Sequence, residues 1–242
     1  MAETADIVVI GAGIAGVGAG AWLAEGGAQV VVLEAEAAPG YHATGRSAAM
    51  FILNYGNATL RALNAASLPL LSGDAPEAEG CALAPRGALM VADATEGAAL
   101  EAYLAGSRGA EEIATDAALR LCPILRPEAA RRAAWEADAQ DIDVDALLQG
   151  YLRRLRRTGG RLRPSSRVTG LARIGGAWVV ETPSGAIRAA TVVNAAGAWA
   201  DPVAAMAGAR PLGIEPRRRS AAILPAPAGE SVARWPLVVS AE

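Results

Sequence analysis

The segment from Asp6 to Glu34 constrains the fold more than any other part of the chain. It reads as a β-branched strand over 6–10, the turn Gly11-Ala-Gly-Ile-Ala-Gly16, a helix over 17–25 and a second strand over 29–33. A short β-branched run is typical of a strand buried in a parallel sheet. Gly11 permits a tight turn, Gly13 lets a pyrophosphate approach the backbone, and Gly16 lets the helix pack closely on the strand. Because the helix start presents free amides, the segment predicts a dinucleotide-binding βαβ unit.

Glu34 stands at the end of the second strand. A carboxylate at that place can accept hydrogen bonds from both hydroxyls of an adenosine ribose. Its charge would repel a 2′-phosphate, so the motif disfavours NADP, but it does not separate FAD from NAD. A plainer interpretation is that the glycines only serve a tight turn between strand and helix.

A long connection follows this acid, from Ala38 to Met50. An NAD-binding domain normally returns to a helix sooner, whereas this loop suits a cofactor that extends past its pyrophosphate, as FAD does. Thr44, Arg46 and Ser47 offer hydrogen bonds and one positive charge, although Arg46 could also be an ordinary surface arginine. We interpret His42 as a structural or loop-capping residue in preference to a proton-transferring base.

Composition excludes several kinds of chemistry. All 22 basic residues are Arg, because the chain contains no Lys. Pyridoxal-phosphate enzymes, P-loop NTPases and protein kinases each need a Lys, so all three are excluded. A single His and two distant cysteines, Cys81 and Cys122, indicate no metal site and predict two free thiols.

Charge and hydropathy predict a protein of the reduced cytosol. The net charge of −3 offers no footprint for nucleic acid or an anionic membrane, so we expect neither as a partner. Residues 1–6 are acidic where a signal peptide is basic, and the apolar run that follows is broken by glycines. No apolar stretch is long enough to span a bilayer. We therefore expect a cytoplasmic protein.

Apolar periodicity predicts further elements of an α/β chain. Two helices are predicted over 58–71 and 96–105, a third from Asp143 to the stop at Gly159-Gly160, and a fourth that begins near Asp201. Predicted strands cover 87–92, 161–168, 178–181, 190–193, 213–224 and 237–240. We interpret the arginines after Asp143 as a solvated helix face. Asn194-Ala-Ala-Gly197 supplies the small residues that are needed where a chain passes close to a cofactor.

With these motifs in this order, the sequence resembles the FAD-dependent D-amino-acid oxidase superfamily. Within that superfamily it is most similar to the D-arginine dehydrogenase-like and glycine oxidase-like enzymes. The residues that carry the resemblance are 9–16, 32–34, 39–49, 141–147, 193–199 and 217–220. The resemblance implies an α/β fold in which a Rossmann-like FAD-binding domain with a parallel sheet contains an inserted mixed-sheet α+β substrate domain. We predict residues 1–75 and 139–208 for the first domain, and 76–138 and 209–242 for the second, incomplete at its C-terminus.

The resemblance also implies the residues of the site. The implied FAD contacts are Gly11, Gly13, Ile14, Ala15, Gly16, Glu34, Ala35, Ala43, Thr44, Gly45, Arg46, Ser47, Ala48, Ala49, Met50, Val168, Ala196 and Gly197. The implied catalytic residues are Tyr55, which would contact the substrate, and Arg219, which would clamp its carboxylate. Each has a plainer alternative, a packed core tyrosine and a capped strand arginine.

The implied activity is oxidation of the CH–NH group of a D-amino acid or a related small amine. Hydride passes to flavin N5, and water hydrolyses the imino acid to a 2-oxo acid and ammonia. The electron acceptor stays open between oxygen, a quinone and another protein. Relatives that prefer basic substrates carry an acid where this chain has Gly87-Ala-Leu89, so we expect small or apolar substrates. Met50 and Ala43 also depart from the polar residues of close relatives.

Two other interpretations stay open. One is an NAD-dependent dehydrogenase, which the loop over 38–50 and the Asn194-Ala-Ala-Gly197 motif disfavour. The other is an inactive FAD-binding fragment, because family members continue past residue 242 and supply further strands of the substrate sheet. On this basis we expect the chain, expressed alone, to bind FAD weakly or not at all.

Overall fold

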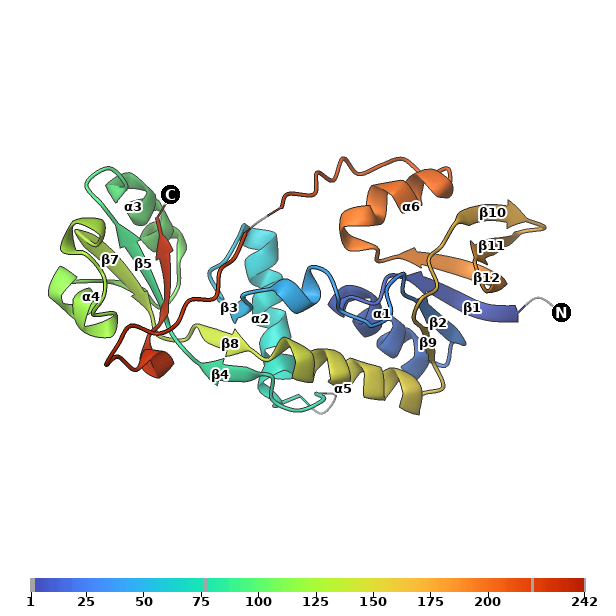
Figure 1. The fold of residues 1–242 in the computed structure, drawn as a ribbon, viewed down its shortest axis with the longest axis horizontal. Helices are drawn as coiled ribbons and strands as arrows, with labels where there is room; N and C mark the ends of the chain where they lie inside the picture. The colour runs from blue at the N-terminus through green and yellow to red at the C-terminus, as the bar shows by residue number, and fades with distance from the viewer. Residues whose placement is uncertain (1–2, 76–77, 219, 242) are drawn as a thin grey trace. The chain divides into compact units, whose positions relative to one another are not determined.

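The computed structural model describes residues 3–75, 78–218 and 220–241 and divides the chain into two units (Figure 1). Unit 1 comprises residues 1–48 and 144–220, and unit 2 comprises 49–143 and 221–242. The predicted boundaries, after 75, 138 and 208, differ from these. Residues 50–51 and 140–142 form strands that pair within unit 2, and Asp201 holds the backbone of 212–214 in unit 1.

Unit 1 contains a six-stranded sheet in the order β10-β11-β12-β1-β2-β9. Four strands are parallel: β12 (Gly185–Asn194), β1 (Glu3–Ile10), β2 (Val30–Leu33) and β9 (Arg161–Arg163). An antiparallel meander of β10 (Gly170–Ile174), β11 (Ala177–Thr182) and β12 completes the sheet. Since β2 and β12 flank β1 on opposite sides, the chain leaves the central strands in two directions, as in other Rossmann-like sheets.

Alternate residues of the central strands face two hydrophobic cores. Val9 and Val32 pack with the helices α1 (Ile14–Glu25) and α5 (Val144–Arg157). Val8 and Val31 face the other way and pack with Val203 of α6 (Ala200–Met206). The sheet is therefore buried on both faces, which explains why β1 and β2 are continuous β-branched runs rather than alternating ones.

Unit 2 contains two smaller sheets. The first has the order β13-β5-β7-β6, and the second has the order β3-β8-β4. Their strands are β3 (Met50–Phe51), β4 (Leu83–Pro85), β5 (Ala88–Ala92), β6 (Ala110–Ile113), β7 (Arg132–Glu136), β8 (Gln140–Ile142) and β13 (Leu237–Ser240). The helices are α2 (Ala58–Ser72), α3 (Gly97–Gly106) and α4 (Thr115–Leu121). Because β13 is parallel to β5 while β7 is antiparallel to both β5 and β6, the first sheet is mixed, as predicted.

Two predicted strands were wrong in whole or in part. The strand predicted over 161–168 ends at Arg163, because Pro164 has no amide to donate and Ser165 adopts a φ of 51°. No strand forms within 213–218 or 220–224. Pro216 has no amide hydrogen to donate to a neighbouring strand, which disfavours a sheet there. The other predicted elements form with ends that differ by a few residues; α1, for example, begins at Ile14.

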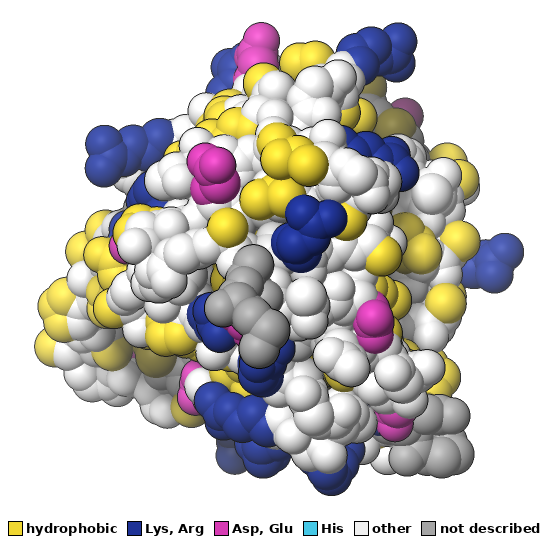
Figure 2. All heavy atoms as spheres, turned by 90° about the vertical axis from the view of Figure 1, so that its right-hand side faces the viewer, with side chains coloured by type: hydrophobic (Ala, Val, Ile, Leu, Met, Phe, Trp, Pro, Cys, Tyr) yellow, Lys and Arg dark blue, Asp and Glu magenta, His cyan; other side chains and the backbone are white. Residues whose placement is uncertain are grey.

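On the face drawn in Figure 2, Arg side chains lie at several places with acidic and hydrophobic side chains between them. No helix within residues 3–75, 78–218 and 220–241 is long and apolar enough to cross a bilayer.

Candidate cofactor-binding site

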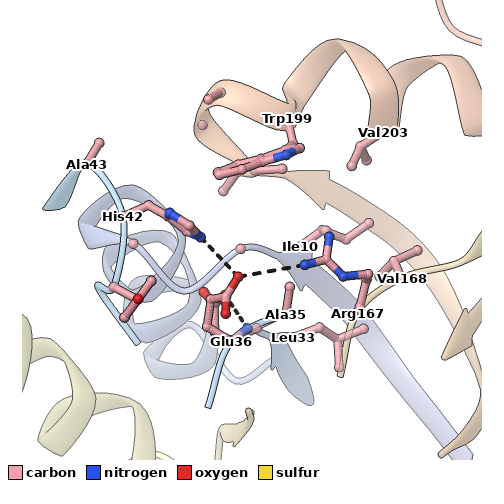
Figure 3. A pocket seen from close by; sticks show the side chains of 18 of the residues that line it. Ile10, Leu33, Ala35, Glu36, His42, Ala43, Arg167, Val168, Trp199 and Val203 are labelled. Atoms are coloured by element: carbon pink, nitrogen blue, oxygen red, sulfur yellow. Dashed lines mark hydrogen bonds and ion pairs between the residues drawn. The ribbon is translucent and has the colours of Figure 1, made fainter. Parts of the chain in front are cut away.

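A cavity of about 260 Å³ opens at the carboxyl ends of the parallel strands of unit 1 (Figure 3). Its walls are formed by residues that follow β1, β2, β9 and β12. Because these four strands are parallel, their carboxyl ends meet at one edge of the sheet. Open α/β sheets bind ligands in the crevice at the topological switch point, where successive connections leave the central strands in opposite directions.

The glycine-rich turn forms the floor of the cavity and tolerates no side chain at two positions. Gly11 has a φ of 103°, and a Cβ at this residue would collide with the carbonyl oxygen of Ala195. A Cβ at Gly16 would collide with the carbonyl oxygen of Gly11. These contacts confirm the tight turn and the close helix packing that the motif predicted.

The amino end of α1 adjoins the cavity. The Ile14 amide donates to Thr44 Oγ1 over 3.0 Å, which ties the loop after β2 to the start of the helix. The following amides of the first turn have no acceptor within the helix. With Gly13 lining the cavity beside them, they fit the pyrophosphate of a dinucleotide.

Glu34 is 9% exposed and lines the same cavity. Its Oε2 accepts a hydrogen bond from the Ala12 amide, and its Oε1 accepts one from the Glu36 amide, both over 2.9 Å. Two backbone donors therefore orient the carboxylate. Each oxygen keeps a further lone pair, so the group can also accept the two hydroxyls of a ribose. The residues present thus fit the adenosine ribose and the pyrophosphate of FAD.

A second polar cluster, formed by Glu36, His42 and Arg167, lines the same cavity (Figure 3). The His42 Nε2 atom lies 3.0 Å from Glu36 Oε1, and an Arg167 guanidinium nitrogen lies 3.7 Å from the same oxygen. The His42 ring also packs against Trp199, with 4.6 Å between ring centroids. Sequence reasoning did not assign Glu36, Arg167 or Trp199 to the site. Glu36 lies in a bend after β2, which ends at Leu33, so no strand periodicity marked it.

The predicted FAD contacts divide into three groups. Those that line the cavity are Gly11, Gly13, Glu34, Ala35, Ala43, Thr44, Val168, Ala196 and Gly197. Those that belong to unit 1 outside the lining are Ile14, Ala15, Gly16, Gly45, Arg46, Ser47 and Ala48, and those in unit 2 are Ala49 and Met50. Arg46 is exposed and donates from Nε to the Tyr41 carbonyl over 3.1 Å.

The cavity also contains residues that sequence reasoning did not name as contacts. Apart from the polar cluster, they are Ile10, Leu33, Gly40, Tyr41, Ser166, Ala198, Pro202, Val203 and Met206; Ala195, within the predicted Asn194-Ala-Ala-Gly197 segment, also lines the cavity. Most are small or apolar and carry no signal of their own. They become lining residues only because they follow strands that end at the same edge.

Of the two predicted catalytic residues, Tyr55 is not among the residues that line this cavity. Tyr55 belongs to unit 2 and is 68% exposed, so it is not the packed core tyrosine of the alternative interpretation. Its amide donates to the Ile52 carbonyl over 3.2 Å. Arg219 lies outside the described residues.

Comparison with known proteins agrees with this geometry. A family model described as DAO, FAD dependent oxidoreductase, matches residues 6–241. Among curated proteins, human mitochondrial dimethylglycine dehydrogenase is 44% identical over 68 residues, 28% of this chain and 8% of that protein.

Solved structures show the same fold. Glycine oxidase from Geobacillus kaustophilus has a TM-score of 0.75 at 22% identity, over 85% of this chain and 59% of that one. L-proline dehydrogenase from P. horikoshii has a TM-score of 0.73 at 24% identity, over 86% and 57%. L-α-glycerophosphate oxidase from Mycoplasma pneumoniae, solved with FAD bound, has a TM-score of 0.76 at 17% identity, over 85% and 57%. The chain thus spans under two thirds of these relatives, and its match to the family model shows that it belongs to the DAO family of FAD-dependent oxidoreductases.

Proposed function

We propose that this chain forms the cofactor-binding part of an enzyme that oxidises the CH–NH group of an amino acid or a related small amine. The observation that carries the proposal is the cavity of unit 1, where a glycine turn, a helix start and the oriented Glu34 carboxylate meet. This donor and acceptor set suits FAD. Two proteins of the same fold, glycine oxidase and L-proline dehydrogenase, are named for amino-acid substrates.

The residues of unit 1 bind and orient the cofactor in this proposal. The first-turn amides of α1 bind the pyrophosphate, and Glu34 accepts the ribose hydroxyls. Thr44 holds the loop after β2 against α1 through its 3.0 Å bond with the Ile14 amide. When bound, FAD supplies the two-electron acceptor, so the protein contributes position and electrostatics rather than a nucleophile.

The finer part of the proposal concerns the substrate. We propose a D-amino acid or small amine with a small or apolar side chain, contacted by Tyr55 and clamped by Arg219. The exposure of Tyr55 supports its role, because a phenol enclosed in a core could not reach a ligand. The fold alone does not choose this substrate, since L-α-glycerophosphate oxidase shares it.

Anaerobic flavin reduction tests this function without any assumption about the electron acceptor. Because we expect the chain by itself to bind FAD weakly, the purified chain is first loaded with FAD in excess and then mixed with D-alanine, D-leucine, D-proline, D-arginine, glycine and the L-enantiomers. We expect at least one small or apolar D-amino acid or amine to bleach the flavin absorbance, and D-arginine to react more slowly. Bound FAD that no substrate bleaches would support the inactive-fragment alternative. Tight binding of NAD in place of FAD would contradict the cofactor.

A further inference from the structure

The cavity of unit 1 has two walls from distant parts of the sequence. One wall is the segment that follows β2, within residues 34–44, and the other is the turn and helix that follow β12, within 195–206. They face one another because β2 and β12 flank β1 in the sheet. A ligand that enters between the walls must pass the side chains that join them.

The rings of His42 and Trp199 form such a contact between the two walls. Their centroids lie 4.6 Å apart with the planes tilted by 55°, a separation at which aromatic rings attract one another. Tyr41 presents its ring to His42 at 5.1 Å in an edge-on arrangement. In Figure 3 the His42 ring and the Trp199 indole reach toward one another from the two walls. The contact therefore links the loop after β2 to the turn after β12.

Glu36 determines the orientation of the His42 ring. Its Oε1 lies 3.0 Å from His42 Nε2, and the same oxygen lies 3.7 Å from the Arg167 guanidinium, which follows β9. With one ring nitrogen bonded to Glu36, the imidazole has a restricted set of orientations, and its plane is tilted by 55° from that of Trp199. His42 is nonetheless 40% exposed, so the contact lies at the mouth of the cavity and can open without unpacking a core.

The size of the cavity and the order of its binding groups indicate that the His42–Trp199 contact lies at the adenosine end of the cofactor. A volume of about 260 Å³ lies below the roughly 300–1,000 Å³ of ordinary small-molecule pockets, although the ligand is a dinucleotide. The start of α1 suits the pyrophosphate and Glu34 suits the ribose, so the adenine of a bound FAD would lie beyond Glu34. Glu36 and Arg167 line that end of the cavity.

We propose that His42, oriented by Glu36 and packed on Trp199, is a clasp that closes the cavity over the adenosine half of FAD. The clasp rests on the cofactor site proposed above. FAD enters and leaves when the His42–Trp199 contact opens, so the clasp slows both association and dissociation. His42 is a positioning residue in this scheme and exchanges no proton or electron with the substrate.

The test measures FAD association and dissociation by stopped-flow flavin fluorescence on the full chain. In H42A we expect both rate constants to rise about three- to tenfold, which corresponds to the loss of one aromatic contact, with a smaller change in Kd. A merely structural role would slow association while it speeds dissociation. H42F keeps a ring against Trp199 without the bond to Glu36, and its rates should lie between those of wild type and H42A.

Trp22 offers a matched control for Trp199. It is 39% exposed on α1, compared with 44% for Trp199, and it packs over Arg154 rather than lining the cavity. W199F should speed both rates, and W22F should leave them unchanged. ADP lacks the flavin, so its binding is followed by tryptophan fluorescence; it should show the same acceleration in H42A because the clasp covers the adenosine half.

Several results would overturn the clasp. Wild-type rates in H42A, equal effects of W199F and W22F, or an acceleration with FAD that is absent with ADP would each contradict it while leaving the cofactor site in place. Failure of the wild-type chain to bind either FAD or ADP would contradict the cofactor site itself, and the clasp with it. Opposite changes in the two rates of H42A would assign His42 a structural role only.

Discussion

At the scale of single residues, the shape of the cavity depends on two glycines, Gly11 and Gly16, which have no side chain. Gly11 and Gly16 leave room where a Cβ would meet the carbonyl oxygens of Ala195 and Gly11. At Gly11 the backbone also adopts a φ of 103°, which L side chains rarely reach. The turn therefore brings the ends of β1 and β12 together and leaves its amides accessible to a phosphate.

Gly11→Ala should destabilise the protein more than Gly27→Ala. Gly27 also has a positive φ, 91°, but a Cβ there meets nothing within 4 Å, so the two variants share backbone strain and differ in the clash. We expect Gly11→Ala to lower the free energy of unfolding by about 1–3 kcal/mol more than Gly27→Ala, the usual cost of overpacking. Urea unfolding measures this difference, and equal losses would contradict the role assigned to the Ala195 contact.

The two thiols should react at very different rates. Cys81 is exposed, whereas Cys122 is buried and its burial raises the pKa of its thiol, which leaves less reactive thiolate at neutral pH. A chromogenic disulfide reagent should label one thiol quickly in the native protein and both after denaturation. Cys81→Ser should remove the fast phase, and Cys122→Ser should keep it. A fast phase that survives Cys81→Ser would show that Cys122 is accessible.

At the scale of elements, Asp201 organises the chain after α6. Its carboxylate accepts hydrogen bonds from the amides of Leu212, Gly213 and Ile214 at 2.8, 2.9 and 2.8 Å. Asp201 also lies in the first turn of α6, where a negative charge is favourable. This arrangement gives the first two amides of the predicted strand, those of Gly213 and Ile214, a partner other than a neighbouring strand.

The protection of these three amides should depend on pH. Hydrogen bonds from the backbone of Leu212, then Ile214 and Gly213, hold the pKa of Asp201 below its ordinary 3.8. A carboxyl whose pKa is lower in the folded state stabilises above its unfolded pKa and loses that effect as pH falls through the folded value. Hydrogen exchange of a peptide over 209–214, corrected for intrinsic rates, should thus show constant protection above about pH 5 and a loss below about pH 4.

Asp201→Ala should remove this protection at every pH. Asp93→Ala is a matched control, because the pKa of Asp93 is also lowered, chiefly by the backbone of Thr95 in its own turn of unit 2. It should leave the 209–214 peptide unchanged. Protection of that peptide in wild type that does not fall as the pH is lowered from 6 through the acid range below 3.8 would argue against control by the Asp201 carboxylate.

At the scale of the whole molecule, the cavity belongs to unit 1. Every residue that lines it comes from the two segments of that unit, 1–48 and 144–220, although the whole of 49–143 separates them in sequence. The parallel sheet explains this, since β1, β2, β9 and β12 all end at one edge. Recognition of the adenosine half of FAD is therefore expected to rest on unit 1.

Ligand protection should map onto unit 1. ADP at about a hundred times its Kd should stabilise the protein by about 2.7 kcal/mol and slow hydrogen exchange in 10–16, 34–44 and 195–206. The strands of unit 2 within 110–136 should change little. Glu34→Gln should weaken ADP binding about ten- to a hundredfold, as expected for the loss of a charged hydrogen-bond acceptor, and Glu230→Gln is its exposed control. Protection confined to unit 2 would contradict the site.

By itself, the sequence determined the βαβ unit and the positions of Gly11, Gly13 and Glu34. These features are local, because glycine spacing and a β-branched run act within about thirty residues. Only the tertiary structure brought Glu36, His42, Arg167 and Trp199 into one cluster. Their segments follow three different strands, and their proximity depends on the order in which those strands pair. Tertiary structure also decided the conformation of 213–224. The apolar pattern there predicted a strand, but the first amides donate to the Asp201 carboxylate instead.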